Sequence, residues 1–312
     1  MAEDVKIIFM GTPDFSVPVL EGLIENYNVV AVVTQPDATV GRTGKITESP
    51  VKKIALEHNI DILQPTKIRN EYQMVLDYEP DIIITCAYGQ IIPKEIIDYP
   101  KYKCINVHAS LLPKYRGGAP IHHAIINGED KTGITVMHMD YGMDDGDILT
   151  TREVTIEYTD TAESLFNKLR IIGRELLLET LPSILDNSIK PIKQNEAEVT
   201  FAYNIKPEDE AINFNKTTRE VYNQIRGLNS WPGGYVIFND KRLKVWAGEE
   251  STYSGKEEVG AIVSIDNGLG IKTKTGKIIL TEIQPEGKKR MNSIDFINGY
   301  PNKKELINTK LN

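Results

Sequence analysis

The sequence predicts an α/β protein with a doubly wound, mostly parallel sheet, followed by a small β-barrel. Through about the first 190 residues, apolar runs of strand length alternate with segments of helical spacing, the pattern of βαβ units. The run at 81–87 is almost unbroken in its apolar character, as expected of a strand buried on both faces. After about residue 230, short strands are separated by Gly, Asn and Asp, which favours a small barrel.

Each expected element has its own local pattern. Residues 15–24 show helical spacing, with Pro18 tolerated in the first turn, and 51–58 suit a helix. Residues 161–187 predict one long amphipathic helix, because their leucines fall on one side. The strands expected in the first sheet are 5–10, 29–33, 60–63, 81–87 and 104–107, with 134–139 and 152–156 as an antiparallel extension. The later elements are a helix at 217–226 and strands at 235–238, 243–247, 260–265, 270–273 and 277–283.

A change of composition near Lys190 divides the chain. A polar stretch without sustained periodicity begins there, so we expect a first domain over 1–189, a linker over 190–208 and a second domain over 209–312. The net charge is −8, but residues 206–312 carry 17 Lys and Arg against 14 Asp and Glu, a balance of +3. Nucleic-acid binding needs a local positive face, and a solvated surface explains this excess equally well.

Composition also points to the cytoplasm. No apolar run approaches the roughly 18 residues that cross a bilayer, and the acidic N-terminus leads straight into a strand rather than a targeting peptide. Cys86 and Cys104 lie in apolar stretches, where buried structural thiols are expected in preference to a disulfide or a metal pair. We therefore expect a cytoplasmic protein without a membrane partner.

Polar residues in three segments form a candidate active site. Asn106 and His108 are two apart in an apolar run, so a strand would point both to one face, near the sheet edge where ligands bind. A turn follows at 112–118, and a carboxylate-rich loop at 140–147. Asn can donate to an oxyanion, His can move a proton, and Asp can orient His, which suits attack on a carbonyl. On spacing alone, a polar cap of the strand and a turn or cation loop at 140–147 fit as well.

Nucleotide-binding motifs do not match. The turn at 11–13 lacks the second and third glycines of the dinucleotide fingerprint, and the chain has no Walker A loop. His122 and His123 are adjacent at an expected helix start, so their side chains diverge. Solvated or packed histidines are therefore favoured over metal ligands at this position.

The candidate residues resemble the formyltransferase family that uses 10-formyltetrahydrofolate. Residues 110–117 match its SLLPxYRG motif, and Asn106, His108 and Asp144 fall on its catalytic Asn, His and Asp. Supporting segments occur in order along nearly the whole chain: 9–15 (FMGTPDF), 34–37 (TQPD), 50–52 (PVK), 87–89 (AYG), 230–233 (SWPG) and 287–289 (GKK). Within the family, the chain is most similar to the members that formylate methionyl initiator tRNA.

The resemblance implies a catalytic Rossmann-like domain, an OB-like tRNA-binding domain, and Asn106, His108 and Asp144 as catalytic residues. It also implies 10-formyltetrahydrofolate as cosubstrate, methionyl initiator tRNA as acceptor, a role in translation initiation, no metal and no stable protein partner. The folate-contacting residues expected from it are Ala87, Tyr88, Gly89, Gln90, Ile91, Ser110, Leu111, Leu112 and Pro113. The tRNA-contacting residues are Arg42, Lys45, Lys288, Lys289 and Arg290.

Three other functions stay open. A sugar-nucleotide N-formyltransferase shares the three polar residues, but the TQPD and PVK segments are not expected in it. A formyltetrahydrofolate hydrolase shares them too and uses water in place of the amine. A non-catalytic RNA-binding protein could be built on an inactive enzyme domain, although retention of all three polar residues argues against this.

Overall fold

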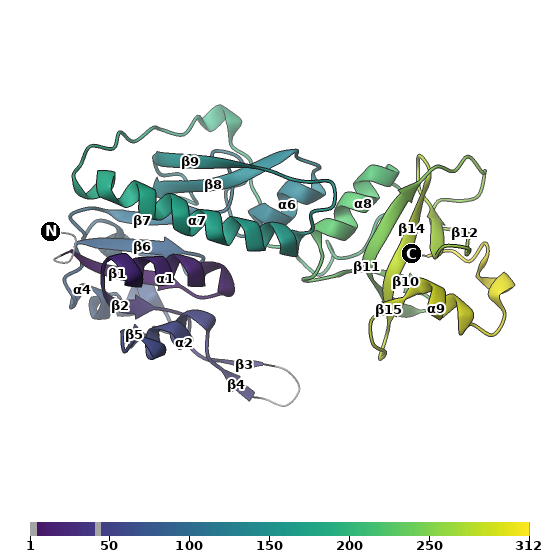
Figure 1. Cartoon of the computed structure of the whole chain (residues 1–312), viewed down its shortest axis with the longest axis horizontal. Coiled ribbons are helices and arrows are strands. Elements are labelled where there is room, and N and C mark those ends of the chain that lie inside the picture. The colour runs from purple at the N-terminus through teal and green to yellow at the C-terminus, as the bar shows by residue number, and fades with distance from the viewer. Residues whose placement is uncertain (1–4, 41–44, 312) are drawn as a thin grey trace. The chain divides into compact units, whose positions relative to one another are not determined.

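The structure is a computed structural model that describes residues 5–40 and 45–311 (Figure 1). The chain forms two compact units. Unit 1 comprises the chain up to Pro120, Thr132–Thr155 and Phe166–Tyr203, and unit 2 comprises Ile121–Lys131, Ile156–Leu165 and the chain from Asn204 onward. Two short segments of the expected first domain, 1–189, thus belong to unit 2, whereas the sequence pattern favoured contiguous domains.

Unit 1 is built on a seven-stranded sheet with the order β5-β2-β1-β6-β7-β8-β9. The neighbours from β5 to β7 pair in parallel, whereas β8 runs antiparallel to β7. Apolar strands of this kind are buried on both faces, which explains their nearly continuous hydrophobic runs. The bounds are β1 (Lys6–Gly11), β2 (Asn28–Val33), β5 (Asp61–Leu63), β6 (Ile82–Cys86), β7 (Cys104–His108), β8 (Lys131–His138) and β9 (Ile148–Thr155).

Helices cover both faces of this sheet, which confirms the doubly wound prediction. On one face, Ile8 and Met10 of β1 share a buried core with apolar residues of α3, α4 and α5. α1 and α7 lie on the other face (Figure 1), where a Cβ added to Gly173 would lie 3.2 Å from Cγ1 of Val107. The bounds are η1 (Asp14–Ser16), α1 (Val17–Asn26), α2 (Pro50–Glu57), α3 (Ile68–Glu71), α4 (Gln73–Leu76), α5 (Lys94–Ile97) and α7 (Ala162–Leu185).

Two segments outside the main sheet of unit 1 are ordered by backbone pairing. In the 37–49 loop, β3 (Ala38–Val40) pairs antiparallel with β4 (Lys45–Thr47). The stretch after α7, expected to be a linker, packs on unit 1 as far as Tyr203. There Ile192 bridges Ile148, Phe201 bridges Arg116, and a short turn, η2 (Glu196–Glu198), lies between them. Polar composition indicated a linker, but backbone hydrogen bonds to distant segments hold this stretch in place.

Unit 2 contains an antiparallel sheet with the order β10-β11-β14-β13-β12 and with β15 beside β14. Register shifts near Ala247 bend the β11–β14 pair. The sheet curls into a half-barrel around a core of alternate residues such as Val245 and Leu280, with Val221 and Ile225 of α8 packed on it. This confirms the expected second β-domain. The bounds are α6 (Pro120–Ile126), α8 (Thr218–Gly227), β10 (Gly234–Phe238), β11 (Lys241–Ser251), β12 (Ile262–Ser264), β13 (Leu269–Lys272), β14 (Lys277–Pro285), β15 (Met291–Asn292), α9 (Ser293–Asn298) and η3 (Lys303–Leu306).

Both cysteines are buried free thiols, as expected. Burial raises the pKa of the Cys86 thiol to about 12, so it remains protonated and is a poor nucleophile near neutral pH. None of the helices in the described ranges is long and apolar enough to cross a membrane.

Candidate active site

The carboxyl ends of β6 and β7 present the first polar side chains of the site. These strands are parallel and place Thr85 beside Asn106. The Thr85 hydroxyl donates to Oδ1 of Asn106 at 2.9 Å, which orients the amide so that Nδ2 faces the site. His108 follows two residues later and lies on the same face of the strand, as the two-residue period requires.

Asp144 completes the group from the loop between β8 and β9. Its Oδ1 lies 3.4 Å from Nδ2 of Asn106, and its Oδ2 lies 3.6 Å from Nδ1 of His108. The amide of Gly117 donates to Oδ2 at 2.8 Å. Asp144 itself has φ = 48°, the left-handed region that few non-glycine residues adopt. The structure therefore brings the three predicted polar residues together, and their catalytic roles remain a proposal.

The His108 ring is held from both sides. Only 6% of the residue is exposed, and Nε2 lies 3.0 Å from the carbonyl oxygen of Tyr115. Because a carbonyl can only accept, Nε2 carries a proton and donates this hydrogen bond. Nδ1 is consequently the ring nitrogen left to face the site, and it lies 3.6 Å from Oδ2 of the Asp144 carboxylate.

The SLLPKYRG turn supplies backbone groups rather than side chains to the site. The amide of Tyr115 donates to Oγ1 of Thr200 at 2.9 Å, which holds the carbonyl that receives the His108 bond. Gly117 has φ = 121°, and a Cβ there would lie 2.7 Å from the carbonyl oxygen of Ala202. Only glycine fits this position, whose amide binds Asp144.

A fifth side chain, Gln194, binds the backbone of the Asp144 loop. Its Nε2 donates to the carbonyl oxygens of Asp144 (2.7 Å) and Gly146 (2.8 Å). Sequence patterns do not indicate Gln194, because it lies in a polar stretch without periodicity. Thr85 could have been identified, since it is a polar residue near the end of an apolar strand expected beside 104–107.

Some residues of the expected folate segment after β6 are exposed, and the others are buried or hydrogen-bonded within the protein. Ala87 (φ = 48°), Gly89 (φ = 92°) and Ile91 are exposed, and Ile91 is 90% exposed. The Tyr88 side chain is buried, and the Gln90 amide bonds to the backbone of Ile68 and Pro65 and to the Gln35 side chain. Exposed apolar and glycine positions can thus meet a flat ring, whereas the Tyr88 and Gln90 side chains hold the loop.

The second expected folate segment is mostly internal. Ser110 is buried, donates from Oγ to the carbonyl of Lys114 at 2.7 Å, and accepts at its own carbonyl from Thr135. Leu112 is buried, while Leu111 and Pro113 are partly exposed. Leu111 and Pro113 are therefore better placed for direct ligand contact than the other two.

Two carboxylates of 140–147 have hydrogen-bond partners within the protein. Asp140 accepts from the amide of Tyr141 and is exposed, while Asp144 binds Gly117. Within the residues that the structure describes, no group of three or more His, Cys, Asp or Glu side chains could hold a metal ion.

Three of the expected tRNA contacts, Lys288, Lys289 and Arg290, are exposed cations of unit 2. Lys288 and Lys289 are exposed after β14, and Arg290 pairs with Glu282 (Nη2–Oε2, 2.6 Å) and lies over the Trp246 ring. Arg42 lies outside the described residues, and Lys45 is described only as part of β4. Two cations on the solvent face of β11 were not anticipated: Arg242 lies over Tyr235 (4.2 Å) and Lys244 over Trp246 (5.3 Å).

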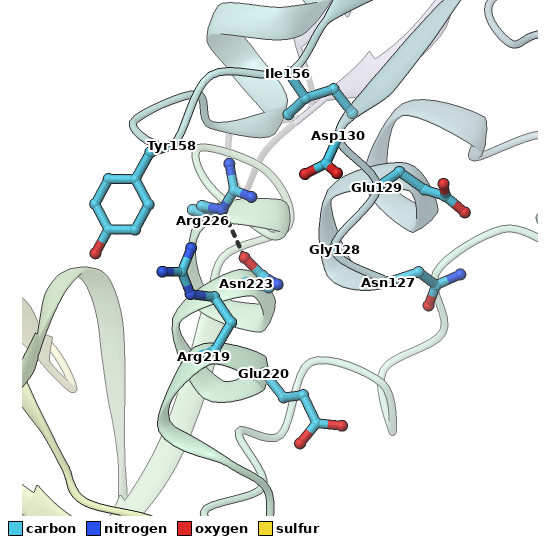
Figure 2. Close-up of a pocket in the computed structure, with 10 residues that line it drawn as sticks. All are labelled: Asn127, Gly128, Glu129, Asp130, Ile156, Tyr158, Arg219, Glu220, Asn223 and Arg226. Carbon is cyan, nitrogen blue, oxygen red and sulfur yellow. Dashed lines mark hydrogen bonds between the residues drawn. The ribbon is translucent and has the colours of Figure 1, made fainter.

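A pocket of about 440 Å³ lies entirely within unit 2 and contains none of the three polar residues (Figure 2). Its buried cation, Arg226, donates from Nη1 to the carbonyls of Glu157 and Asp160 and from Nε to Asn223. Arg219 lies over the Tyr158 ring. These contacts of Arg226 and Arg219 hold the 156–165 segment against α8. The polar residues that line the pocket are therefore explained by their role in the structure.

Comparison with known proteins gives a consistent family. The model for "Formyl transferase" matches residues 5–181, and that for "Formyl transferase, C-terminal domain" matches residues 204–301. A methionyl-tRNA formyltransferase of Bacillus mycoides (strain KBAB4) is 54% identical over 313 residues, covering 98% of both chains. One from Bacillus cereus (strain B4264) shows the same identity and coverage.

Solved structures agree in fold. A sugar 3N-formyl transferase, WlaRD, solved with dTDP and 5-N-formyl-THF, has a TM-score of 0.66 and 26% identity, covering 91% of this chain and 99% of its own. An N-formyltransferase of Helicobacter canadensis has a TM-score of 0.69 at 23% identity, covering 90% and 99%, and shows the fold alone. Through both family models and the relatives of high identity, the chain belongs to the formyl transferase family.

Proposed function

We propose that the chain transfers the formyl group of 10-formyltetrahydrofolate to the α-amine of methionine esterified to initiator tRNA. The observation that carries the proposal is the meeting of three polar groups at one sheet edge: the Asp144 carboxylate lies 3.4 Å from the Asn106 amide and 3.6 Å from the His108 imidazole. The high identity to methionyl-tRNA formyltransferases over almost the whole length supports this acceptor. Such a substrate implies a role in translation initiation and a cytoplasmic location.

The first step forms the new C–N bond. The neutral amine attacks the formyl carbon, and the carbonyl π electrons move to oxygen, which becomes an oxyanion. The Asn106 amide nitrogen carries two N–H groups, so it can donate to Asp144 and to the reacting oxygen at once. His108 faces the site through Nδ1, because Nε2 is bonded to Tyr115, and a proton on Nδ1 can be shared between Asp144, 3.6 Å away, and the reacting oxygen. A donor of this type contributes about 3–4 kcal/mol to the transition state.

The second step breaks the bond to N10. The attacking nitrogen releases one proton to Asp144, directly or through water, and the oxyanion electrons re-form the carbonyl. The C–N10 electron pair returns to N10, which takes up the proton held by Asp144, so the carboxylate is restored. Asp144 faces both Asn106 and His108, so one carboxylate supports the imidazolium and accepts the proton. These steps need no covalent enzyme intermediate.

The folate ring is proposed to lie against Ala87, Gly89 and Ile91, where the backbone is open and an apolar side chain is exposed. The Tyr88 carbonyl accepts from the Thr12 hydroxyl (2.9 Å) and from Gln35 (3.1 Å). These bonds hold Ala87 and Gly89 in their left-handed conformations. The folate ring would therefore bind to a surface that is already formed, and binding would not have to order the loop.

The tRNA is proposed to contact the cations Arg42, Lys45, Lys288, Lys289 and Arg290. Lys288, Lys289 and Arg290 are exposed in unit 2, although Arg290 is paired with Glu282, and Arg242 and Lys244 extend the same kind of surface along β11. Exposed cations of this kind position a nucleic acid through its phosphates without reading its bases.

One assay tests the acceptor. Purified protein is incubated with formyl-labelled 10-formyltetrahydrofolate and, separately, methionyl initiator tRNA, methionyl elongator tRNA, free methionine, amino-sugar nucleotides or no acceptor. We expect transfer at least about 100-fold faster to the initiator tRNA, a ratio within the range of enzyme discrimination. Faster transfer to an amino-sugar nucleotide, or release of formate without an acceptor, would replace the proposed function by one of the alternatives.

A further inference from the structure

The polar segment after α7 reaches back to the reacting groups through Gln194. Both N–H groups of its amide are used within unit 1: one donates to the carbonyl of Asp144 at 2.7 Å and the other to the carbonyl of Gly146 at 2.8 Å. The amide oxygen accepts from Nε of Arg116 at 3.0 Å. A single side chain thus joins the carboxylate loop to the SLLPKYRG turn.

We infer that Gln194 is a positioning residue for formyl transfer, which holds the Asp144 carboxylate at the distance from Asn106 and His108 that the chemistry needs. This inference rests on the proposed function of the same site. Gln194 does not touch the reacting atoms, so its effect passes through Asp144.

The backbone of Asp144 needs such a restraint. Its φ of 48° is unfavourable for a side chain that bears a Cβ, so the loop would relax if its carbonyls lost their donors. Relaxation would move the carboxylate away from Nδ2 of Asn106 and Nδ1 of His108. A displacement of about 1 Å in an active site can lower a rate by about 100-fold.

Gln194 is itself held rigidly. Arg116 is only 5% exposed and pairs with Glu196 (Nη2–Oε1, 2.7 Å), two residues after Gln194. The Arg116 backbone also pairs with residues 200 and 202, through the amide of Arg116 to Thr200 and the amide of Ala202 to Arg116. Because Ile192, before Gln194, also pairs with Ile148, the segment is held on both sides of Gln194, and the amide has few alternative positions.

The test compares three single variants. Gln194→Leu removes both donors and the acceptor, whereas Gln194→Glu keeps an acceptor for Arg116 but places a carboxylate against two carbonyls. We expect kcat to fall about 10- to 100-fold in both, with KM for folate and tRNA within about twofold. The control is Asn195→Ala, on the same segment, which removes only a local bond to the amide of Ala197 and should retain wild-type kcat.

A double-mutant cycle separates positioning from a merely structural role. If Gln194 acts through Asp144, adding Gln194→Leu to Asp144→Asn should lower kcat by less than about threefold. A full 10- to 100-fold further reduction would overturn the inference, as would wild-type kcat in Gln194→Glu.

Amide hydrogen exchange provides a readout that needs no acceptor. The Gly117 amide donates to Asp144 Oδ2 at 2.8 Å, so it reports the position of the carboxylate. Its exchange should accelerate in Gln194→Leu but not in Asn195→Ala, and equal rates would contradict the inference. If the wild-type protein proves to formylate another amine, the proposed acceptor fails, while the same cycle run on that amine still tests Gln194.

Discussion

The polar groups proposed to act in unit 1 are held by the protein, whereas those in unit 2 stand on its surface. His108 is 6% exposed, donates to Tyr115 and faces Asp144, which in turn binds Gly117. Lys288 and Lys289 are exposed at the end of a strand. Formyl transfer needs donors at a defined distance from a developing charge, while phosphate binding depends on charge that acts over several ångströms.

This difference explains why the two regions should respond unequally to substitution. Removal of one buried polar side chain of unit 1 leaves its hydrogen-bonding partners unpaired in a site with little water, and the rate of formyl transfer should fall steeply. Removal of one surface cation leaves the other cations to bind the nucleic acid, and fewer counterions are released.

The largest expected effect is that of Asp144→Asn. The substitution preserves size but removes the charge that supports the imidazolium and the oxygen that accepts a proton, so kcat should fall by about 10³. Steady-state formylation of methionyl initiator tRNA measures this reduction. The matched control is Asp145→Asn, and if it proves the more damaging of the two, the carboxylate has been assigned to the wrong residue.

Next come His108→Ala and Asn106→Ala, each expected to lower kcat by about 10²–10³ with little change in KM for tRNA, because both remove a donor to the oxyanion. Single-turnover formylation at saturating tRNA checks this. His58→Ala, which alters an exposed histidine at the end of α2, serves as the control. Turnover near that of the wild type in both variants would remove this pair from the mechanism.

A smaller effect is expected at the surface of unit 2. Lys288→Ala and Lys289→Ala should each raise KM for tRNA a few-fold rather than lower kcat. They should also reduce the slope of log KM against log salt by about 0.9 for each phosphate that the variant no longer binds. Titration of KM between low and moderate salt measures this. Lys304→Ala, another exposed lysine of unit 2, should leave the slope unchanged, and an equal change there would show a diffuse rather than local effect.

The smallest expected effect is on the pH dependence of stability and concerns His122, a hydrogen-bonded side chain of unit 2. Nδ1 of His122 lies 2.8 Å from the Gly227 carbonyl, and burial lowers the pKa of the imidazole. At this position the unfolded chain therefore binds a proton more readily than the folded chain does. The contribution of His122 to folding stability is fully present above about pH 6.5 and is lost as the pH falls below that value. His122→Asn keeps a donor but cannot titrate, and the Tm should then decline less between pH 7 and 5. An unchanged decline would assign the acid sensitivity to other groups, among them His138, whose pKa burial also lowers.

Much of the architecture follows from the sequence alone. The continuous apolar runs predicted the parallel strands, since a strand buried on both faces has no polar side. The spacing of Asn106 and His108 predicted that they share a face, because the side-chain period of a strand is two residues. The 24-residue helix Ala162–Leu185 was likewise predicted to within a few residues. These are local properties, which a short window of sequence determines.

The tertiary structure decided which distant groups meet. Four carboxylates lie within eight residues in the 140–147 loop, and the bend of the loop at φ = 48°, with the Gly117 amide, places Asp144 against His108. Gln194 and Thr200 reach the site because the stretch after α7 folds back onto unit 1. No periodic pattern marks such residues, since their positions depend on pairing between segments about 50 to 85 residues apart in sequence, and that pairing forms only when the whole unit has folded.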